Sequence, residues 1–365
     1  MIALVVARTA GGTGRHVRAV AAALAAAGRD VVVAGPRSAE ETFTFSAVAR
    51  YDAVEVSTGP RPVADLRAVR RLRRVLRDAT VVHAHGIRAA ALAGAAVPAA
   101  TPFVTTWHNA LLGSPLRRAL WSPLERRVAR RATVTLCVSA DLVERVRALG
   151  GRDVRLAPVG ARRPPVAARP PGEVRAAVRA ALGAGGDDRP LLVAAGRLTE
   201  QKGYDLLLDA AERWDVRTPR PRTVVAGDGP LRAALVEDAE RRGVDVTFVG
   251  RRDDVPDLFA AADVVVLPSR WEGSPLSAHE ALFSGTPLVA TAVGGVPELL
   301  GGGAALLTPP GDARAFAEAV LRLLDDPAYA GQVAAAGRAR AEEWPDEDEA
   351  ARRVLALYDE MYPRP

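Results

Sequence analysis

The chain has 365 residues, of which 49% are hydrophobic and 25% charged, and its formal net charge is +6 at pH 7. This length predicts two domains, and the composition is typical of a folded globular protein rather than a disordered chain. Cys137 is the only cysteine, which excludes a disulfide framework and a cysteine-based zinc or iron–sulfur site.

Short β-branched segments alternate with Ala-, Leu- and Arg-rich segments through the first half of the chain. This alternation predicts a parallel sheet with crossover helices, two of them at Arg15–Ala27 and Leu66–Arg77. The expected strands are Ile2–Ala7, Val31–Ala34, Val54–Val56, Val81–Ala84, Phe103–Thr106, Val134–Val138 and Val154–Ala157.

Residues 161–172, ARRPPVAARPPG, hold four prolines and no periodic apolar pattern, which predicts an interdomain linker. The alternation then resumes, and apolar residues at helical spacing over 346–362 predict a final helix. The expected strands are Leu191–Ala195, Thr223–Ala226, Val246–Val249, Val264–Leu267, Leu288–Ala290 and Ala304–Leu307. We therefore expect an N-terminal domain over 1–165, a second domain over 166–345 and a C-terminal helix over 346–365.

Each half thus predicts a doubly wound α/β sheet, a fold that binds ligands at the carboxyl ends of its strands. The first residues form only a short apolar run with no basic segment before it, unlike a secretory signal. The Ala-rich segment 89–96 is too short to cross a bilayer. We therefore expect a cytoplasmic protein.

The charge is divided unevenly between the halves. Residues 1–165 carry 26 arginines and 11 acidic residues, whereas residues 166–365 carry 23 basic and 32 acidic residues. A basic half favours an anionic lipid surface or a nucleic acid as partner. The excess of arginine is equally typical of a GC-rich genome, and no nucleic-acid recognition motif is present, so we expect no nucleic-acid binding.

A glycine-rich segment, Ala10-Gly11-Gly12-Thr13-Gly14, follows the first strand and precedes the first helix. Glycine lets backbone N–H groups approach a ligand closely, and a helix N-terminus favours anions. The segment does not match the dinucleotide fingerprint G-x-G-x-x-G, because position 17 is valine. A phosphate contact and a tight structural turn both remain open.

The loop after the strand Leu191–Ala195 contains Arg197 and Lys202. Two cations five residues apart at the ligand-binding edge can neutralise a diphosphate without a metal ion. Lys202 is the only lysine in the chain. Its position in this loop indicates that a compact ammonium group is needed there.

The segment SRWEGSPLSAHEA, residues 269–281, follows the strand Val264–Leu267. Ser274 is expected to cap a helix whose first residue is Pro275, and its free N–H groups would suit a phosphate. Glu272 and Glu280 could then hold hydroxyl groups on opposite sides of a bound phosphate. Gly227-Asp228-Gly229-Pro230, Gly250-Arg251 and residues 291–298 are further turns at strand ends.

Two histidines, His83 and His85, alternate along one strand and share a face. Neither a carboxylate nor a third histidine lies nearby in sequence, so we expect no metal site. Arginines gather on the helix at residues 67–77 and in the segment 116–131, which also contains Trp121 and leucines. These arginines indicate either a solvated face or the surface of an anionic membrane.

Taken in order, these segments resemble retaining family 4 glycosyltransferases of the GT-B architecture. The matching segments are GGTGRH, VVHAHG, VTTWHN, GRLTEQKG, AGDGPL, VGRRDD, PSRWEGSPLSAHEALFSGTPLVAT and VGGVPE, and Glu272 with Glu280 fits the family's E-x7-E signature. Ser274 stands where the family usually has an aromatic residue, so we expect a different donor-sugar pocket. The resemblance implies two Rossmann-like domains facing across a cleft, with the C-terminal helix packing back on the N-terminal domain.

The resemblance also implies a nucleotide-diphosphate sugar, UDP- or GDP-linked, as cosubstrate, with no other cofactor and no metal. Arg197 and Lys202 would hold the diphosphate, Glu280 the ribose and Glu272 the sugar hydroxyls. Gly250 and Arg251 would meet the base. The remaining donor contacts would come from Gly12, Gly273, Ser274, Pro275, Leu276 and Ser277.

The N-terminal domain would bind the acceptor through Gly11, Gly12, Thr13 and His16, and His108 would contact the donor sugar near the reaction centre. With Glu272, Arg197 and Lys202, His108 completes the expected catalytic set. We expect sugar transfer with retention to a membrane lipid, an envelope glycan precursor or a small natural product. Contact with the inner face of the plasma membrane stays open. The alternatives are a sugar-nucleotide epimerase or phosphorylase on this fold, and a non-catalytic nucleotide-sugar-binding protein.

Overall fold

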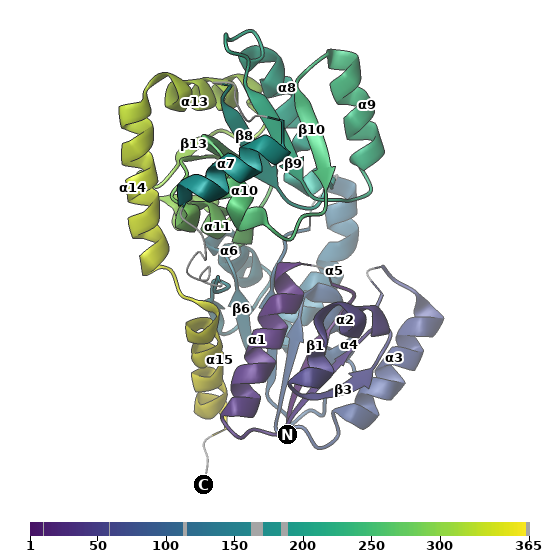
Figure 1. The fold of residues 1–365 in the computed structure, drawn as a ribbon. Coiled ribbons are helices and arrows are strands. Elements are labelled where there is room, and N and C mark those ends of the chain that lie inside the picture. The colour runs from purple at the N-terminus through teal and green to yellow at the C-terminus, as the bar shows by residue number, and fades with distance from the viewer. Residues whose placement is uncertain (10, 58, 112–114, 162–170, 184–188, 363–365) are drawn as a thin grey trace. The chain divides into compact units, whose positions relative to one another are not determined.

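Two all-parallel β-sheets organise the chain, as the alternation of strands and helices predicts (Figure 1). The computed structural model describes residues 1–9, 11–57, 59–111, 115–161, 171–183 and 189–362. One unit contains residues 1–160 and 345–365, and the other contains residues 161–344. The expected domain boundary at residue 165 and most of the expected linker lie outside the described residues.

The first unit has the strand order β3-β2-β1-β4-β5-β6-β7. Its strands are β1 (Ile2–Val6), β2 (Val31–Gly35), β3 (Arg50–Ala53), β4 (Val81–His85), β5 (Phe103–Trp107), β6 (Val134–Cys137) and β7 (Val154–Leu156). Its helices are α1 (Gly12–Ala26), α2 (Arg37–Phe43), the 3-10 helix η1 (Phe45–Ala47), α3 (Pro62–Val75), α4 (Ile87–Gly94), α5 (Pro115–Arg131), α6 (Ala140–Ala148) and α15 (Glu347–Met361).

The final helix α15 packs along α1, so the chain's last helix belongs to its first unit (Figure 1). Asp346 caps α15 by accepting a hydrogen bond from the Glu349 N–H, a role that aspartate favours. Val354, Leu357 and Tyr358 of α15 are buried in one core cluster with Leu4 and Val6 of β1. The expected return of the C-terminal helix to the N-terminal domain is therefore confirmed.

The second unit repeats the topology with the order β10-β9-β8-β11-β12-β13. Its strands are β8 (Leu191–Ala195), β9 (Arg222–Ala226), β10 (Val246–Gly250), β11 (Val264–Leu267), β12 (Leu288–Thr291) and β13 (Leu306–Thr308). Its helices are α7 (Pro171–Ala181), the 3-10 helix η2 (Glu200–Lys202), α8 (Tyr204–Trp214), α9 (Arg232–Arg242), α10 (Val255–Ala261), α11 (Leu276–Ser284), α12 (Val296–Leu300), α13 (Ala313–Asp325) and α14 (Pro327–Glu343).

Helices cover both faces of the second sheet. Leu191 and Val193 of β8 pack with residues of α7, α10 and α11, whereas Leu192 and Ala194 pack with α8 and α13 on the opposite face. Side chains alternate along a strand, so a strand buried on both faces must be apolar throughout. This requirement explains why β8 reads LLVAA.

Several local predictions are wrong. The helix expected at Leu66–Arg77 is α3, which begins at Pro62 and ends at Val75. The expected strand Val54–Val56 is displaced, because β3 ends at Ala53 and the next residues make only single backbone bonds, such as that from the Val54 N–H to the Gly35 oxygen at 2.8 Å. Strand β13 begins at Leu306 rather than Ala304. Helix α11 begins at Leu276, with Pro275 in extended conformation at its N-cap, so neither Ser274 nor Pro275 has the expected place.

Candidate active site

In both sheets the strand order reverses beside the first strand, between β1 and β4 in one unit and between β8 and β11 in the other. Connections leave adjacent strands in opposite directions at such a switch point, which opens a crevice at the carboxyl ends of the strands. The expected site residues of the second unit lie in the loops after β8, β10 and β11 and on α11. The histidines of the first unit lie on α1, on β4 and just after β5.

Lys202 and Glu272 form an ion pair at the switch point of the second sheet. The Lys202 ammonium Nζ lies 2.5 Å from Glu272 Oε1, and the Ser269 hydroxyl donates to the same oxygen at 2.6 Å. The Glu272 side chain is only 6% exposed and that of Lys202 18%. A buried carboxylate needs such partners, because burial without them strongly disfavours its charge.

The two loops that carry this pair are also joined through their backbones. The Arg270 N–H donates to the backbone carbonyl oxygen of Gln201 at 2.8 Å. The Gln201 side-chain amide donates to the backbone carbonyl oxygen of Trp271 at 3.0 Å. The Gly295 N–H donates to the backbone carbonyl oxygen of Glu272 at 2.9 Å. These bonds fix the orientation of Glu272 before any ligand arrives.

Glycines allow the loops to approach each other this closely. A Cβ on Gly294 would lie 1.9 Å from the Glu272 carbonyl oxygen, and one on Gly227 would lie 1.9 Å from the Gly196 oxygen. Both residues also have positive φ, which favours glycine. The AGDGPL turn therefore packs its backbone against the loop that carries Arg197.

Among the described residues, one oxygen of Glu272 receives both the lysine and the serine bonds, and no described residue donates to Oε2. Lysine has three donor hydrogens, so Lys202 can keep its bond to Glu272 and still donate to an anion. Arg197 is exposed and forms no ion pair with any described residue. Burial, and to a lesser extent the charge of Glu272, raises the pKa of the Tyr204 hydroxyl.

The other expected donor residues occupy the same carboxyl edge of the sheet or the helix beyond it. Gly250 ends β10 in a left-handed conformation, and the Arg251 side chain is 84% exposed. Glu280 lies on α11 and is half-buried, which does not fit a fully solvated helix face. Gly273, Ser274, Pro275, Leu276 and Ser277 connect Glu272 to this helix.

In the first unit, histidines from three elements meet at the carboxyl end of the sheet. His16 lies in α1 immediately after its first turn, His85 ends β4, and His108 follows β5. The His85 Nδ1 lies 3.2 Å from the His108 Nε2, and the His16 ring centroid lies within 6 Å of both other rings, at 5.7 and 5.5 Å. Burial lowers the pKa of His16 to about 4 and that of His85 and His108 well below the usual value.

His83 stacks on His85 with ring centroids 4.1 Å apart, as their shared strand face predicts. Both of its nitrogens are engaged, Nδ1 with the Tyr358 hydroxyl at 2.5 Å and Nε2 with the Thr106 hydroxyl at 2.6 Å. His83 therefore links β4 to β5 and to α15 instead of facing a ligand.

The glycine-rich segment of the first unit is partly structural. Helix α1 begins at Gly12, three residues earlier than expected, so Gly12 and Thr13 are helical, and Gly11 has a φ of 77°. A Cβ on Gly14 would lie 2.2 Å from the Phe43 ring. Gly14 thus allows α1 to pack on α2, while Ala10 lies outside the described residues.

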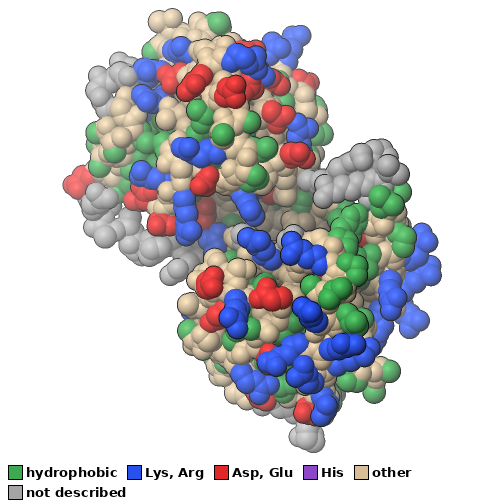
Figure 2. All heavy atoms as spheres, turned by 90° about the vertical axis from the view of Figure 1, so that its right-hand side faces the viewer, with side chains coloured by type: hydrophobic (Ala, Val, Ile, Leu, Met, Phe, Trp, Pro, Cys, Tyr) green, Lys and Arg blue, Asp and Glu red, His purple; other side chains and the backbone are tan. Residues whose placement is uncertain are grey.

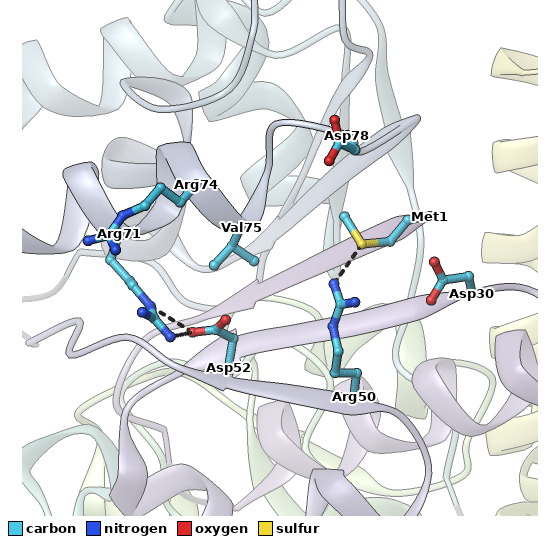
Figure 3. A pocket seen from close by; sticks show the side chains of 8 residues that line it. All are labelled: Met1, Asp30, Arg50, Asp52, Arg71, Arg74, Val75 and Asp78. Atoms are coloured by element: carbon cyan, nitrogen blue, oxygen red, sulfur yellow. Dashed lines mark hydrogen bonds and ion pairs between the residues drawn. The ribbon is translucent and has the colours of Figure 1, made fainter.

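A cavity of about 390 Å³ lies at the opposite end of the first sheet (Figure 3). Figure 3 shows Arg71 paired with Asp52 and Arg50 donating to the Met1 sulfur. Its lining mixes cations and carboxylates at the amino ends of β1, β2 and β3. Ligands of doubly wound sheets bind at the carboxyl ends, so this cavity is not the candidate active site.

Sequence reasoning missed Ser269, Gln201, Tyr204 and Gly294, all of which surround the Lys202–Glu272 pair. Ser269 and Gln201 could have been found, because they stand in the same two loops as Glu272 and Lys202. Gly294 could not, because its contact with Glu272 depends on how the loops after β11 and β12 meet.

Comparison with known proteins agrees with this arrangement. The family described as glycosyl transferase 4-like domain matches residues 11–162, and the family described as glycosyl transferases group 1 matches residues 189–326. The chain is 31% identical to glycogen synthase of Mycobacterium tuberculosis, in a match that covers 90% of this chain and 86% of that protein. The chain therefore belongs to the group 1 glycosyltransferases with a glycosyl transferase 4-like N-terminal domain.

Other relatives match part of their own length. The 2-deoxystreptamine N-acetyl-D-glucosaminyltransferase of Streptomyces fradiae is 36% identical, and the putative teichuronic acid biosynthesis glycosyltransferase TuaC of Bacillus subtilis is 33% identical. Each match covers 70% of this chain and 64% of the relative. The solved structure of HepE from Anabaena in complex with UDP-glucose is 20% identical, with a TM-score of 0.81 over 98% of this chain and 99% of that one. This likeness confirms the GT-B architecture.

Proposed function

We propose that the protein transfers a sugar from a nucleotide-diphosphate sugar to an acceptor hydroxyl, with retention of anomeric configuration and without a metal ion. The observation that carries this proposal is the Lys202–Glu272 pair at the switch point of the second sheet. It offers a cation for a diphosphate and, beside it, a carboxylate oxygen for sugar hydroxyls. The family membership and the UDP-glucose held by HepE support a nucleotide sugar as donor.

The chemistry follows from where charge develops. Breaking the bond between the anomeric carbon and the phosphate oxygen leaves positive charge on the sugar and negative charge on the diphosphate. Lys202 and Arg197 stabilise the leaving diphosphate electrostatically, as fixed charges do best in a partly dry site. The acceptor oxygen then bonds to the anomeric carbon on the same face, and its proton passes to the departing phosphate.

Glu272 accepts hydrogen bonds from the sugar hydroxyls through Oε2, while Oε1 stays with Lys202 and Ser269. Glu280 binds the ribose, and Gly250 and Arg251 meet the base. His108 contacts the donor sugar, and Gly11, Gly12, Thr13 and His16 contact the acceptor. This assignment needs no carboxylate nucleophile, because Glu272 holds the sugar in place instead of attacking it.

The test begins with a thermal-shift panel of UDP, GDP and other nucleoside diphosphates on the tag-free chain. We expect one of them to raise the melting temperature of the wild type. The same nucleotide should leave the melting temperature of the Lys202→Met/Glu272→Gln double variant unchanged. This variant removes both charges together, so it leaves no unpaired buried ion. Arg213→Ala, at an exposed arginine of the same unit, is the matched control and should respond like the wild type.

The acceptor and the stereochemistry are then tested with the sugar nucleotide of the responding base. The names of the relatives direct the acceptor panel to aminocyclitol natural products and to envelope glycan precursors. Mass spectrometry should show a glycosylated acceptor, and NMR should show the donor's anomeric configuration retained. Conversion of the sugar nucleotide without any acceptor would instead indicate an epimerase or phosphorylase, and binding without turnover a non-catalytic protein.

We also propose that the first unit contacts anionic membrane through α3. Arginine side chains crowd the face of this unit that Figure 2 shows. Five exposed arginines lie on α3 and a sixth, Arg77, just after it, and the apolar Val63 and Leu66 of α3 are 67% and 52% exposed. Exposed apolar groups next to cations suit a lipid interface. The exposed arginines are Arg67, Arg70, Arg71, Arg73, Arg74 and Arg77.

Sedimentation with anionic liposomes tests this contact. We expect binding at low salt that weakens as salt screens the charges and that is lost in the Leu66→Ser/Arg70→Ser/Arg74→Ser variant. The Arg213→Ser variant should bind like the wild type. An unchanged affinity in the α3 variant would show that these arginines are simply a solvated face. In the part of the chain that the structure describes, no helix is both long and apolar enough to cross a bilayer.

A further inference from the structure

Four of the chain's five histidines converge at the carboxyl end of one sheet, although they come from widely separated segments of the chain. Three of them, His16, His85 and His108, each offer a ring nitrogen, and these nitrogens all lie within 4.8 Å of one another. We propose that this group, which we call the histidine triad, binds one divalent transition-metal ion, Zn²⁺ in the first instance.

The spacing of the triad suits zinc. Zinc–nitrogen bonds of tetrahedral sites place two ligand nitrogens about 3.3 Å apart. The His85 Nδ1 and the His108 Nε2 are 3.2 Å apart. The third ligand, at most 4.8 Å from the other nitrogens, must approach by up to about 1.5 Å to reach that spacing, and no described residue hydrogen-bonds either nitrogen of His16 to hold it back.

The surroundings of the triad suit a metal as well. Imidazole nitrogens are common metal ligands, and all three rings are buried. In addition, the His85 Nε2 is buried without a hydrogen-bond partner.

His83 explains how the ring of His85 is held. It stacks on His85 and is itself fixed by the hydroxyls of Tyr358 and Thr106. Both its nitrogens are occupied, so it supports the triad without joining it. Three histidine ligands leave one position of a tetrahedral zinc for water, the arrangement of an open site rather than a closed structural one.

The consequence for activity rests on the proposed function. His108 is the residue assigned to the donor sugar and His16 to the acceptor, so a metal on the triad occupies both. We therefore expect Zn²⁺ to inhibit transfer reversibly. Binding of the metal is independent of that assignment, because it needs only the three imidazoles.

Metal titration of the tag-free apo-chain tests the site, since a histidine tag would itself bind metal. We expect one equivalent of Co²⁺ to give the visible absorption bands of a tetrahedral complex, and Zn²⁺ to displace it. His16→Ala and His85→Ala should each weaken Zn²⁺ binding at least about tenfold. Cys137→Ser and His279→Gln should leave it unchanged, since neither residue belongs to the triad.

The proposal is overturned if the wild type shows no saturable binding of Co²⁺ or Zn²⁺, or if binding survives in both triad variants. Far-UV circular dichroism and the UDP or GDP thermal shift show whether each variant is folded. A retained nucleotide shift with lost metal binding separates the triad from the donor site. With an acceptor in hand, the Zn²⁺ concentration that halves the rate should rise at least about tenfold in His85→Ala.

Discussion

The two sheets share a strand order, yet their switch points carry opposite chemistry. In the second unit the site is a charged pair, Lys202 with Glu272, held by Ser269. In the first unit it is a group of buried, neutral histidines. The same topology thus provides a position for a ligand without deciding its chemistry. The loops after the strands decide it: fixed charge suits a diphosphate, and neutral imidazoles suit hydroxyl groups or a metal.

The strongest test of this contrast removes the charge from the second site. Lys202→Ala should lower turnover at least about a hundredfold, equivalent to about 2.7 kcal/mol of transition-state stabilisation. Nucleotide affinity should fall as well, because the diphosphate loses its cation. Steady-state kinetics and calorimetric titration measure the two effects. A near-normal rate in the folded variant would refute the role of Lys202.

A backbone change should damage the same site without touching a charge. In Gly294→Ala the new Cβ would lie 1.9 Å from the Glu272 carbonyl oxygen, at a residue with a φ of 53°. We expect the chain to lose about 2 kcal/mol of unfolding free energy and to bind nucleotide more weakly. Urea unfolding measures the first effect. Gly331→Ala, where nothing lies within 4 Å of the added Cβ, is the control.

The neutral site should respond differently. His108→Ala should lower turnover about tenfold, or about 1.4 kcal/mol, while nucleotide affinity stays within about twofold of the wild type. The reason is that the histidine carries no charge to share with the diphosphate. Parallel measurement of turnover and nucleotide affinity checks this split. A large loss of nucleotide affinity would contradict the division of labour between the two sites.

A buried histidine of the second unit, His279, should affect the folding stability of the chain and its dependence on pH rather than its activity. His279 is buried on α11, where burial lowers its pKa to about 3. The unfolded chain takes up a proton below pH 6.5 and the folded chain does not, so stability is full above that pH and falls below it. The expected loss is about 1.4 kcal/mol per pH unit.

Comparison of the wild type with His279→Leu isolates this loss. The difference between their unfolding free energies should shift in favour of the variant by about 1 kcal/mol between pH 6.5 and pH 5.5, since the unfolded histidine is already half protonated at pH 6.5. Urea unfolding at the two pH values provides the measurement. An identical pH dependence for both proteins would mean that His279 is protonated in the folded chain.

The smallest expected effect is a gain. Gly331 lies in the interior of α14 with open space around it. Alanine should therefore stabilise the chain by about 0.5–1 kcal/mol, since glycine is a poor helix former. Thermal unfolding detects such a change. A destabilised Gly331→Ala would weaken its use as the control for Gly294→Ala.

Much of the fold could be predicted from sequence because each sheet is buried on both faces, which leaves continuous apolar strands such as β8. Edge strands are harder to predict. Val54 and Val56 have strand-like burial, but the ladder of β3 lies just before them. The predicted start of α11 was wrong because the sequence Ser274-Pro275 is also compatible with an extended segment that precedes a helix.

The candidate site could be predicted where its residues follow neighbouring parallel strands, as Lys202 follows β8 and Glu272 follows β11. The histidine triad could not. His83 and His85 stand two residues apart on β4, but His16 and His108 join them only because β1, β4 and β5 are neighbours in the sheet. Sequence spacing alone pointed to the pair His83–His85, whereas the structure groups His85 with His16 and His108.

The most direct test of the central claim is a crystal structure of the chain with bound UDP or GDP, whichever gives the thermal shift. The account predicts that the diphosphate lies within hydrogen-bonding distance of the Lys202 Nζ, at the carboxyl ends of β8 and β11. A nucleotide bound well ordered elsewhere, with Lys202 still paired only with Glu272, would contradict it.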